Sequence, residues 1–586
     1  MSDSKLLMQE GHSRREFLKR TVGVLWCGAS SSGASAQVQE RDFREASGRN
    51  GLVVSVSAPA TQVGIEILRA GGNAVDAAVA VAFALAVTYP PAGNIGGGGF
   101  MNVFVPPVLR ARFPKLSQPA IVVDYREVAP LKAHREMFQR GDSPHQHKAV
   151  GVPGTVAGLA LAHAMLGKLP WRRVVEPAIA LARDGFAVDA PLASSLQNIL
   201  NQSKAFPELQ RVFAPPDGQR WKAGAVLRQA DLAWTLKQIA DGGAEAFYHG
   251  PIAEKIIAEM QRGGGWIHRD DLKAYRPKLR SAIFFRFGQY EIYSNPPASS
   301  GGITLSLILR QVAEFPYRQW GRWDLRTLHV LIEAMRRAYV ERARWLGDPD
   351  FVPIPDHLLD PEFARRLAKS IRLDRATPSR ELAPDIVLTP EGTETTHFSV
   401  LDADGIAVAN TYTLEHSYGS RIVVRGAGFL LNNEMTDFNW FPERTTAGGL
   451  IGTPPNQIAP GKRMLSSMTP TIAVRDSRPV LITGSPGGRT IINTVAQIIL
   501  NRLAFELPPR SSVDLPRLHH QWFPDEVRYE PADPWGADLL QGLRRLGHKV
   551  LAADRQGEAH SIFYDDERAT YHAVADGRVS GSAGSA

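Results

Sequence analysis

The chain has 586 residues and a formal net charge of +8, which comes from 67 basic and 59 acidic side chains. Its 52 glycines and 41 prolines are too few for collagen-like or low-complexity structure, so the composition is that of a globular protein. No dense run of Lys and Arg lies beyond the first twenty residues, which argues against a nucleic-acid partner. The single cysteine, Cys27, excludes a disulfide framework and a thiolate metal cluster within the chain.

The amino terminus has the pattern of an export signal. The basic string Ser13–Arg20 (S-R-R-E-F-L-K-R) precedes a short apolar stretch, Thr21–Ala29, and the small residues Ala34–Ala36 form an A-x-A exit. This pattern resembles a twin-arginine signal peptide, with a solvated basic helix as the alternative. We predict a signal peptide over 1–36 and a periplasmic or secreted protein. The apolar stretch is too short to cross a bilayer. We also expect no membrane span in the mature chain, because its apolar run Ala77–Val87 has the length of a buried core helix.

The first part of the mature chain is rich in helix patterns. Apolar spacing predicts a helix over Thr61–Val87, interrupted at Gly71-Gly72 and stopped by Pro90-Pro91. The run Gly96–Gly99 predicts a flexible turn. We predict further strands over Phe100–Val105 and 119–125, and further helices over Gly154–Leu166, Trp171–Asp184 and Asp324–Leu346.

The character of the chain changes after a segment rich in proline and charge, Leu373–Glu394, which we predict to be an exposed connector. Apolar and polar residues then alternate over His397–Leu401 and Ile406–Leu414, with Asp404-Gly405 between the two segments. This pattern predicts a β-hairpin. Runs of strands and helices of this kind favour sheets covered by helices, in a layered α/β or α+β fold. The other predicted elements are strands over Arg421–Leu431, Thr471–Val474 and Val480–Thr483, and helices over Arg489–Leu500 and Pro534–Leu546.

Common cofactor and metal motifs are missing from the sequence. It contains no G-x-x-x-x-G-K-[ST], no G-x-G-x-x-G and no H-E-x-x-H string, and we predict neither a cofactor nor a metal. Ser485 lacks the first glycine of a G-x-S-x-G elbow and is a weak candidate for a nucleophile. His519 and His520 are adjacent and point apart on any regular element, so we expect them to make structural hydrogen bonds.

Six short strings occur in an order and rough spacing that resemble one known family. They are Asp124–Pro130 (D-Y-R-E-V-A-P), Glu394–Val400 (E-T-T-H-F-S-V), Leu430–Phe438 (L-L-N-N-E-M-T-D-F), Lys462–Pro470 (K-R-M-L-S-S-M-T-P), Thr483–Gly488 (T-G-S-P-G-G) and His519–Trp522 (H-H-Q-W). The family is the γ-glutamyltransferases, which are amino-terminal nucleophile hydrolases. The resemblance runs from about Ala58 to the carboxyl end. It implies an α+β fold with a four-layer αββα sandwich, built from two chains after self-cleavage.

The resemblance makes Thr395 the nucleophile. A threonine hydroxyl is a weak nucleophile at neutral pH and needs an adjacent base. A chain break before Thr395 would place a free α-amine, with a pKa of about 8, beside its own Oγ as a competent general base. The resemblance implies that the precursor cuts itself between Glu394 and Thr395. The products would be a large subunit, 37–394, and a small subunit, 395–586.

Three further residues take catalytic roles by the same resemblance. Thr413 matches a second threonine that hydrogen-bonds and orients the nucleophile. Gly487 and Gly488 match a pair whose backbone N–H groups form an oxyanion hole. Glycine permits the close backbone approach that such donors need.

The resemblance also implies a clamp for the α-amino-acid end of a γ-glutamyl group. Arg126 would grip the α-carboxylate in a bidentate manner, with Ser466 and Ser467 as additional donors. Glu434 and Asp437 would hold the α-ammonium. Taken singly, Arg126 is typical of a surface salt bridge and the serines of a turn, but the matched cation, donor and anion set favours a clamp.

Glu415 departs from the family pattern, which usually has asparagine two residues after the second threonine. A carboxylate there makes the pocket more acidic, and we expect it to affect substrate range and transfer efficiency more than hydrolysis. The segment Asn439–Pro460 carries Trp440 and Phe441 and is rich in Gly, Pro and Thr. We interpret it as a mobile loop that covers the site, with an inert surface loop as the alternative.

Three functions stay open, and the first is favoured. The leading hypothesis is a self-processing hydrolase/transferase that acts on glutathione and other small γ-glutamyl compounds, with water, an amino acid or a peptide as acceptor. The second is an acylase of the same fold for glutaryl amides or poly-γ-glutamate. A glutaryl group has no α-ammonium, so the acidic set counts against it. The third is an uncleaved periplasmic protein that only binds γ-glutamyl compounds.

Overall fold

The computed structural model describes residues 43–586, apart from residues 115, 117, 384–393 and 441–453. Residues Phe43–Ala586 form one compact unit. The predicted signal peptide, 1–36, lies outside the described residues. No helix in the described part of the chain combines the length and the apolar character that crossing a bilayer requires.

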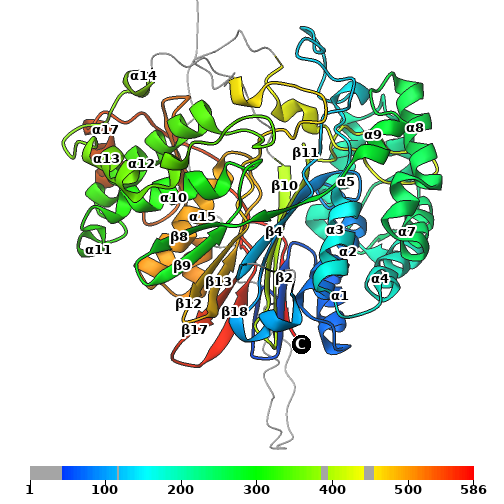
Figure 1. The fold of residues 1–586 in the computed structure, drawn as a ribbon, viewed down its shortest axis with the longest axis horizontal. Helices are drawn as coiled ribbons and strands as arrows, with labels where there is room; N and C mark the ends of the chain where they lie inside the picture. The colour runs from blue at the N-terminus through cyan, green and yellow to red at the C-terminus, as the bar shows by residue number, and fades with distance from the viewer. Residues whose placement is uncertain (1–42, 115, 117, 384–393, 441–453) are drawn as a thin grey trace, which may run out of the picture. The chain divides into compact units, whose positions relative to one another are not determined.

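Two seven-stranded antiparallel sheets form the centre of this unit (Figure 1). We call them the β10 sheet and the β12 sheet. The β10 sheet has the order β19 (Ser582–Ser585), β2 (Gly51–Ser55), β10 (Glu394–Asp402), β11 (Ala407–Glu415), β3 (Gly98–Phe104), β4 (Ala120–Asp124), β7 (Lys278–Ser281). The β12 sheet has the order β1 (Glu45–Gly48), β18 (Thr570–Val574), β17 (Ser561–Asp565), β13 (Arg478–Thr483), β12 (Thr471–Arg475), β9 (Tyr290–Ser294), β8 (Ile283–Phe287).

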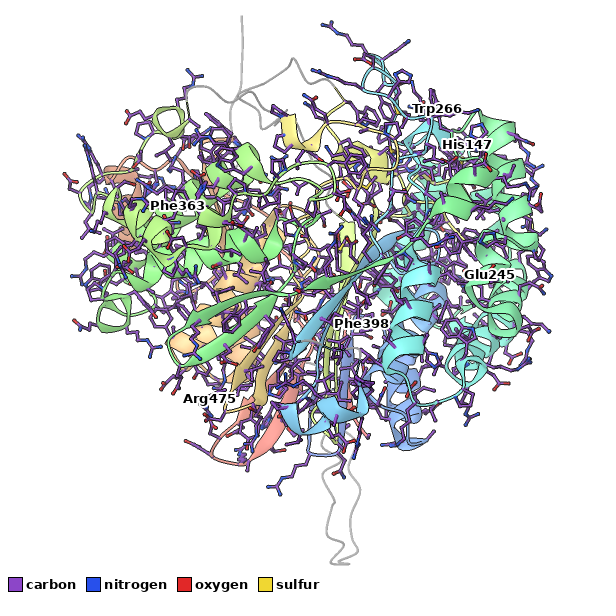
Figure 2. The ribbon with its side chains drawn as sticks, in the orientation of Figure 1. His147, Glu245, Trp266, Phe363, Phe398 and Arg475 are labelled. Carbon is purple, nitrogen blue, oxygen red and sulfur yellow. The ribbon has the colours of Figure 1, made fainter. Side chains whose placement is uncertain are left out.

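Helices cover the outer face of each sheet, and the two inner faces pack together (Figure 1). Val54 and Ala409 of the β10 sheet share an apolar core with Ile472 and Ile562 of the β12 sheet. Phe398, labelled in Figure 2, points instead to the helix side of the β10 sheet. Alternate residues of β10 therefore face the two different cores. The arrangement is the predicted four-layer αββα sandwich, an α+β fold.

The helices agree closely with the sequence patterns. The predicted helix over Thr61–Val87 is two helices that break at the Gly71-Gly72 pair, and the second starts with a capping box from Asn73 and Asp76. The helices on the β10 side are α1 (Ala58–Arg69), α2 (Ala74–Thr88), α3 (Thr155–Leu166), α4 (Trp171–Asp184), α5 (Ala190–Gln202), α6 (Pro207–Val212), α7 (Ala230–Tyr248), α8 (Pro251–Gly263) and α9 (Arg269–Ala274). The later helices are α10 (Gly301–Ala313), α11 (Tyr317–Trp320), α12 (Leu325–Trp345), α13 (Pro361–Lys369), α14 (Ser379–Leu382), α15 (Thr490–Ile499), α16 (Pro509–Asp514) and α17 (Ala537–Arg545).

Two predictions of local structure are wrong. The run Gly96–Gly99 is not a flexible turn, because it is buried and leads into β3. A Cβ on Gly97 would lie 2.0 Å from the carbonyl oxygen of Thr413, so glycine is needed there for close packing. The predicted strand over Arg421–Leu431 is a set of turns with one bridge between Val423 and Leu430. Positive φ angles at Arg421, Gly426 and Gly428 interrupt the extended backbone.

The predicted connector is exposed over much of its described part, but it has a firm anchor. Ser379 is fully buried. Its hydroxyl accepts a hydrogen bond from Arg336 (2.6 Å) and donates one to the carbonyl of Trp522 (2.7 Å). Its backbone N–H donates to Asp525 (2.8 Å). The rest of the connector, 384–393, lies outside the described residues.

Both sheets combine strands from either side of residue 394. The hairpin of β10 and β11 lies between β2 and β3, which come from the first part of the chain. In the β12 sheet, the block β18-β17-β13-β12 lies between β1 and β9. The two predicted subunits would therefore be interleaved in each sheet.

Candidate active site

The predicted nucleophile lies at the start of β10, and its hydroxyl meets that of Thr413 on β11. The two Oγ1 atoms are 3.5 Å apart, and the exposed fractions of Thr395 and Thr413 are 6% and 1%. The pairing of β10 with β11 is regular from Thr396 onward and is irregular between Glu394 and Thr396. Thr395 therefore occupies the position where the ladder is distorted.

Hydrogen bonds to its side chain and to its backbone carbonyl fix Thr413. Its Oγ1 accepts a hydrogen bond from the N–H of Glu415 (2.7 Å), and its carbonyl accepts one from Asn94 Nδ2 (2.8 Å). Asn94 Oδ1 in turn accepts from the N–H of Gly97 (3.0 Å). Asn94 was not among the predicted site residues. Its position between Pro90-Pro91 and the glycine run is the one signal in the sequence that marks it.

A buried histidine lies two residues beyond the nucleophile on the same face of β10. His397 Nδ1 is 2.8 Å from Thr411 Oγ1, and its Nε2 is 3.1 Å from Ser399 Oγ. Ser399 donates to the carbonyl of His560 (2.8 Å). Burial, with a smaller contribution from His560, lowers the pKa of His397 well below its usual range. His397 is therefore a neutral bridge between β10 and β11.

The predicted oxyanion-hole glycines follow β13 in a loop that packs on this histidine. A Cβ on Gly484 would lie 2.4 Å from the His397 ring. Gly487 and Gly488 have φ angles of 122° and 56°, which favour glycine. A Cβ on Gly487 would also lie 2.5 Å from Thr490 Oγ1. Within the described ranges, we find no hydrogen bond donated by the N–H of Gly487 or Gly488.

Arg126 is fully buried directly after β4 and lies among carboxylates. It forms hydrogen-bonded ion pairs with Glu434 and Asp437, and its Nη1 is 3.7 Å from Glu127 Oε2. Burial raises the pKa of Glu127 to about 8 and raises that of Glu434 well above its usual range, against the opposing effect of Arg126. Arg126, Glu434 and Asp437 of the predicted clamp thus lie together. The Arg126 cation pairs with Glu434 and Asp437, the acids that we expected to bind the substrate ammonium instead.

Glu415 completes an acidic trio with Glu434 and Asp437. One ligand atom from each lies within 4.8 Å of the others, and all three residues are buried. Glu415 has a φ of 79°, uncommon for a residue with a side chain. Three carboxylates at this spacing suit a metal ion or an ammonium group. Glu415 is the last residue of β11, two positions after Thr413. It therefore lies between the threonine pair and the predicted clamp.

The two predicted serines lie in a tightly held loop. Ser466 Oγ accepts from the N–H of Met468 (3.0 Å), and its carbonyl accepts from the N–H of Ser300 (2.8 Å). Ser467 Oγ accepts from Nη2 of Arg342 (3.0 Å). Arg342, on α12, was not a predicted site residue. Nothing in the sequence distinguishes it from the other arginines of that helix.

The predicted covering loop and the histidine pair are the remaining features that the sequence singled out. Trp440 stacks on Phe138 with ring centroids 3.7 Å apart, and the rest of the predicted covering loop, 441–453, is outside the described residues. His519 and His520 are buried and make hydrogen bonds to Asn493, Gln521, Asp525 and Trp522, as expected.

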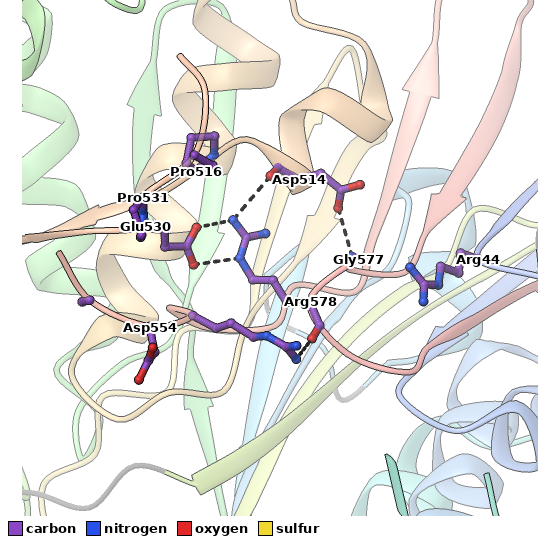
Figure 3. Close-up of a pocket in the computed structure, with 11 residues that line it drawn as sticks. Arg44, Asp514, Pro516, Glu530, Pro531, Asp554, Gly577 and Arg578 are labelled. Atoms are coloured by element: carbon purple, nitrogen blue, oxygen red, sulfur yellow. Dashed lines mark hydrogen bonds and ion pairs between the residues drawn. The ribbon is translucent and has the colours of Figure 1, made fainter. Parts of the chain in front are cut away.

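A surface cavity of about 770 Å³ is lined by none of the candidate residues (Figure 3). Its lining includes Arg578, whose Nε donates to Glu530 (2.8 Å), and Asp514, which accepts from the N–H of Gly577 (3.0 Å). Arg578 and Glu530 bind each other and Asp514 binds the backbone, which indicates a structural role.

Comparison with protein families matches residues 60–586 to the gamma-glutamyltranspeptidase model. The chain belongs to this family. The family resemblance that the six sequence strings indicated is thus confirmed. The protein is an enzyme, a γ-glutamyl hydrolase/transferase.

Several relatives match along almost their whole length. The chain is 41% identical to a glutathione hydrolase proenzyme of Escherichia coli (strain K12), over 95% of this chain and 97% of the relative. It is 35% identical to a glutathione hydrolase proenzyme of Bacillus subtilis (strain 168), over 91% of each chain.

Solved structures support the same fold. A cephalosporin acylase from Bacillus halodurans matches with a TM-score of 0.81 and 26% identity, over 96% of this chain and 99% of that chain. The gamma-glutamyltranspeptidase of Helicobacter pylori matches with a TM-score of 0.52 and 35% identity, over 56% of this chain and 93% of that chain. This γ-glutamyltranspeptidase family member therefore has the predicted fold of the amino-terminal nucleophile hydrolases.

Proposed function

We propose that this family member is a self-processing enzyme that acts on glutathione and other small γ-glutamyl compounds through Thr395. The observation that carries the proposal is the buried pair of hydroxyls of Thr395 and Thr413, 3.5 Å apart on neighbouring strands. The relatives named glutathione hydrolase proenzymes support both the substrate class and a precursor that is cut.

The first reaction is the cut between Glu394 and Thr395. Thr395 Oγ attacks the carbonyl carbon of Glu394, the C–N bond breaks, and the acyl group moves to the oxygen as an ester. The nitrogen takes a proton and becomes the free α-amine of Thr395. One water molecule then hydrolyses the ester, which leaves a carboxylate on Glu394 and restores the threonine hydroxyl. Thr413 orients the attacking oxygen during this step.

The second reaction uses the new amine as a base. The α-amine of Thr395 accepts the Oγ proton while Oγ attacks the γ-carbonyl carbon of the substrate. The N–H groups of Gly487 and Gly488 stabilise the oxyanion. The C–N bond then breaks, the leaving amine takes the proton, and a γ-glutamyl ester remains on Thr395. Water or a second amine attacks this ester and restores the enzyme.

The clamp accounts for selection of the γ-glutamyl group. The substrate α-carboxylate would bind Arg126 with Ser466 and Ser467, and its α-ammonium would bind Glu415, Glu434 and Asp437. Binding would then exchange the ion pairs of Arg126 for pairs with the substrate. Because each charge that enters has an opposite charge in place, the exchange avoids an unpaired buried ion.

Intact mass and amino-terminal sequencing of the purified protein test the proposal. We expect two chains, the smaller starting at Thr395, and hydrolysis of L-γ-glutamyl-p-nitroanilide. Thr395→Ala is expected to stay as one uncut, inactive chain. An uncut wild-type chain without activity would contradict the proposal and favour a binding protein.

The acylase remains a second candidate because a cephalosporin acylase has a similar fold. Comparing L-γ-glutamyl and glutaryl anilides decides between them. We expect the γ-glutamyl compound to react at least tenfold faster in kcat/KM, since a buried acidic trio without its ammonium partner costs free energy.

We also propose export through the twin-arginine route, supported by the string Ser13–Arg20 and the A-x-A exit at Ala34–Ala36. Replacing Arg14 and Arg15 together by Lys is expected to retain the protein in the cytoplasm, which cell fractionation measures. Unchanged export of this variant would overturn the assignment.

A further inference from the structure

The loop that carries the two candidate serines is held by buried arginines. Arg126 Nε donates to the carbonyl of Met464 (3.3 Å). Arg342 Nη2 donates to Ser467 Oγ (3.0 Å), and its Nε donates to Ser300 Oγ (2.8 Å). Arg342 is 2% exposed and projects from α12, an element outside the two sheets. The loop is thus fixed from two directions by guanidinium groups.

Ser300 links Arg342 to Ser466 through hydrogen bonds. Its hydroxyl oxygen accepts from Arg342, so its own proton is directed elsewhere, and it donates to the carbonyl of Ser466 (2.7 Å). The N–H of Ser300 donates to the same carbonyl (2.8 Å). The Ser299 hydroxyl donates to the carbonyl of Met468 (2.7 Å) and lies 3.2 Å from the same Ser466 carbonyl. One edge of the Arg342 guanidinium therefore contacts Ser467 directly and Ser466 through Ser300.

The direction of the bond to Ser467 has a chemical consequence. A hydroxyl has one proton to donate and two lone pairs that accept. Because an N–H of Arg342 occupies a lone pair of Ser467, the hydroxyl proton points away from the guanidinium. The positive charge also polarises the O–H bond and makes it a stronger donor. Whatever its acceptor, the Ser467 hydroxyl therefore donates on the side away from Arg342.

We propose that Arg342 is a positioning residue that sets Ser467 as a hydrogen-bond donor to the α-carboxylate of the γ-glutamyl substrate. This inference rests on the proposed function of Ser467. Arg342 would then affect the binding of the substrate α-carboxylate and would not act on the reacting atoms. The flat fork of arginine is required, because Nε and Nη2 lie on one edge and reach two hydroxyls at once. A lysine offers one nitrogen and cannot hold both.

Steady-state kinetics of Arg342→Lys test the proposal. We measure KM and kcat for L-γ-glutamyl-p-nitroanilide, and inhibition constants for L-glutamate and for 4-aminobutyrate, which lacks the α-carboxylate. We expect KM and the inhibition constant of L-glutamate to rise about tenfold, with kcat changed less than threefold. The inhibition constant of 4-aminobutyrate is expected to stay unchanged. Arg326→Lys, an exposed change on the same helix, is the matched control.

A double-mutant comparison separates positioning from general structure. Ser467→Ala is expected to reproduce the loss of L-glutamate affinity, and Arg342→Lys combined with Ser467→Ala to be no weaker than Ser467→Ala alone. Equal loss of both inhibitors, or additive effects in the double variant, would overturn the proposal. If Arg342→Lys is not processed or does not fold, Ser300→Ala removes one of the two guanidinium contacts. It is then expected to weaken L-glutamate and not 4-aminobutyrate, and the opposite result would overturn the proposal.

The wild-type enzyme provides the separate test of the underlying function. A processed wild-type protein that does not hydrolyse the γ-glutamyl anilide would overturn the proposed function, and the role of Arg342 with it. A wild-type enzyme that is active, with variants that keep their preference for L-glutamate, would overturn the role of Arg342 alone.

Discussion

Thr395 and Thr413 face each other from neighbouring antiparallel strands at the place where the β10–β11 ladder loses its regular register. Thr413 is held by Asn94 and by the close approach of Gly97, whereas Thr395 sits at the distortion. Of the two, Thr413 is therefore the fixed residue, and Thr395, the proposed nucleophile, lies beside the irregular segment. We propose that this local departure from the flat ladder gives the Thr395 hydroxyl access to the carbonyl of Glu394.

Removal of the Thr413 hydroxyl is expected to slow both reactions. Thr413→Ala deletes the partner of Thr395 Oγ1, and the loss of a hydrogen bond of about 1.5–3 kcal/mol corresponds to about 10- to 100-fold in rate. Thr413→Ser keeps the oxygen and is expected to stay within about fivefold of wild type. A time course of precursor cutting on denaturing gels and the kcat of the processed enzyme measure the two effects. Equal rates in the alanine variant and wild type would remove Thr413 from the mechanism.

Neutralising Glu415 is expected to weaken the preference for an α-ammonium. In Glu415→Gln the trio keeps its shape and loses one negative charge, so KM for a γ-glutamyl anilide rises by about tenfold. The rate with a glutaryl anilide is expected to hold or to increase. Glu567→Gln, on the exposed surface, is the control. Parallel changes for the two anilides would show that Glu415 does not contact the ammonium.

Loss of the Ser379 hydroxyl is expected to reduce stability without affecting catalysis. Ser379→Ala leaves the carbonyl of Trp522 and one N–H of Arg336 without their present partner, at a cost of about 1–3 kcal/mol. Denaturant unfolding measures the loss, and KM and kcat are expected to match wild type. Ser47→Ala, an exposed change, is the comparison. A normal midpoint for Ser379→Ala would mean that the connector anchor contributes nothing.

Stability is expected to fall in mild acid because several histidines are buried as the neutral form. Burial, with the nearby charges of His329 and Arg336, lowers the pKa of His548 to about 3. The unfolded chain binds the proton near pH 6.5 and the folded chain does not. Stability from this group is therefore lost as pH falls below about 6.5, at up to about 1.4 kcal/mol per pH unit.

His548→Gln tests this sign directly. The variant cannot bind the proton, so its unfolding free energy is expected to decline less steeply than that of wild type between pH 6.5 and 4. Thermal or denaturant unfolding at several pH values gives the two slopes. Identical slopes would show that His548 is protonated in the folded protein.

The sequence predicted most of the fold because its signals were local. Trp171–Asp184 was predicted with the bounds that the structure has, since amphipathic spacing and a following glycine define both ends. The hairpin of β10 and β11 followed from alternation around Asp404-Gly405. The error at Gly96–Gly99 has a different cause. Glycine there serves packing against Thr413 and not freedom of the backbone, and that contact joins segments more than 300 residues apart.

Site residues that belong to a recognisable motif could be predicted from the sequence. Residues that reach the site only because of the fold could not. Thr395, Thr413 and the acids near Arg126 lie together as their strings implied. Arg342 was missed because nothing in its local sequence separates it from the other arginines of α12. Asn94 was missed because its position between Pro90-Pro91 and the glycine run indicates a turn and does not by itself indicate a site residue. The pairing of Arg126 with Glu434 and Asp437 was also missed, since the order of residues does not say whether opposite charges meet each other or a ligand.

The interleaving of the two sheets has a consequence for the life of the enzyme after its cut. While the chain is continuous, every strand is tethered to its neighbours, and folding is an event within one molecule. Once the bond before Thr395 is gone, β2 and β3 belong to one polypeptide and the hairpin between them to another. Recovery from unfolding then requires an encounter of two molecules, and the tether no longer supplies a high effective concentration. We therefore expect the stability of the mature enzyme to be kinetic: it unfolds slowly, and it refolds poorly once unfolded.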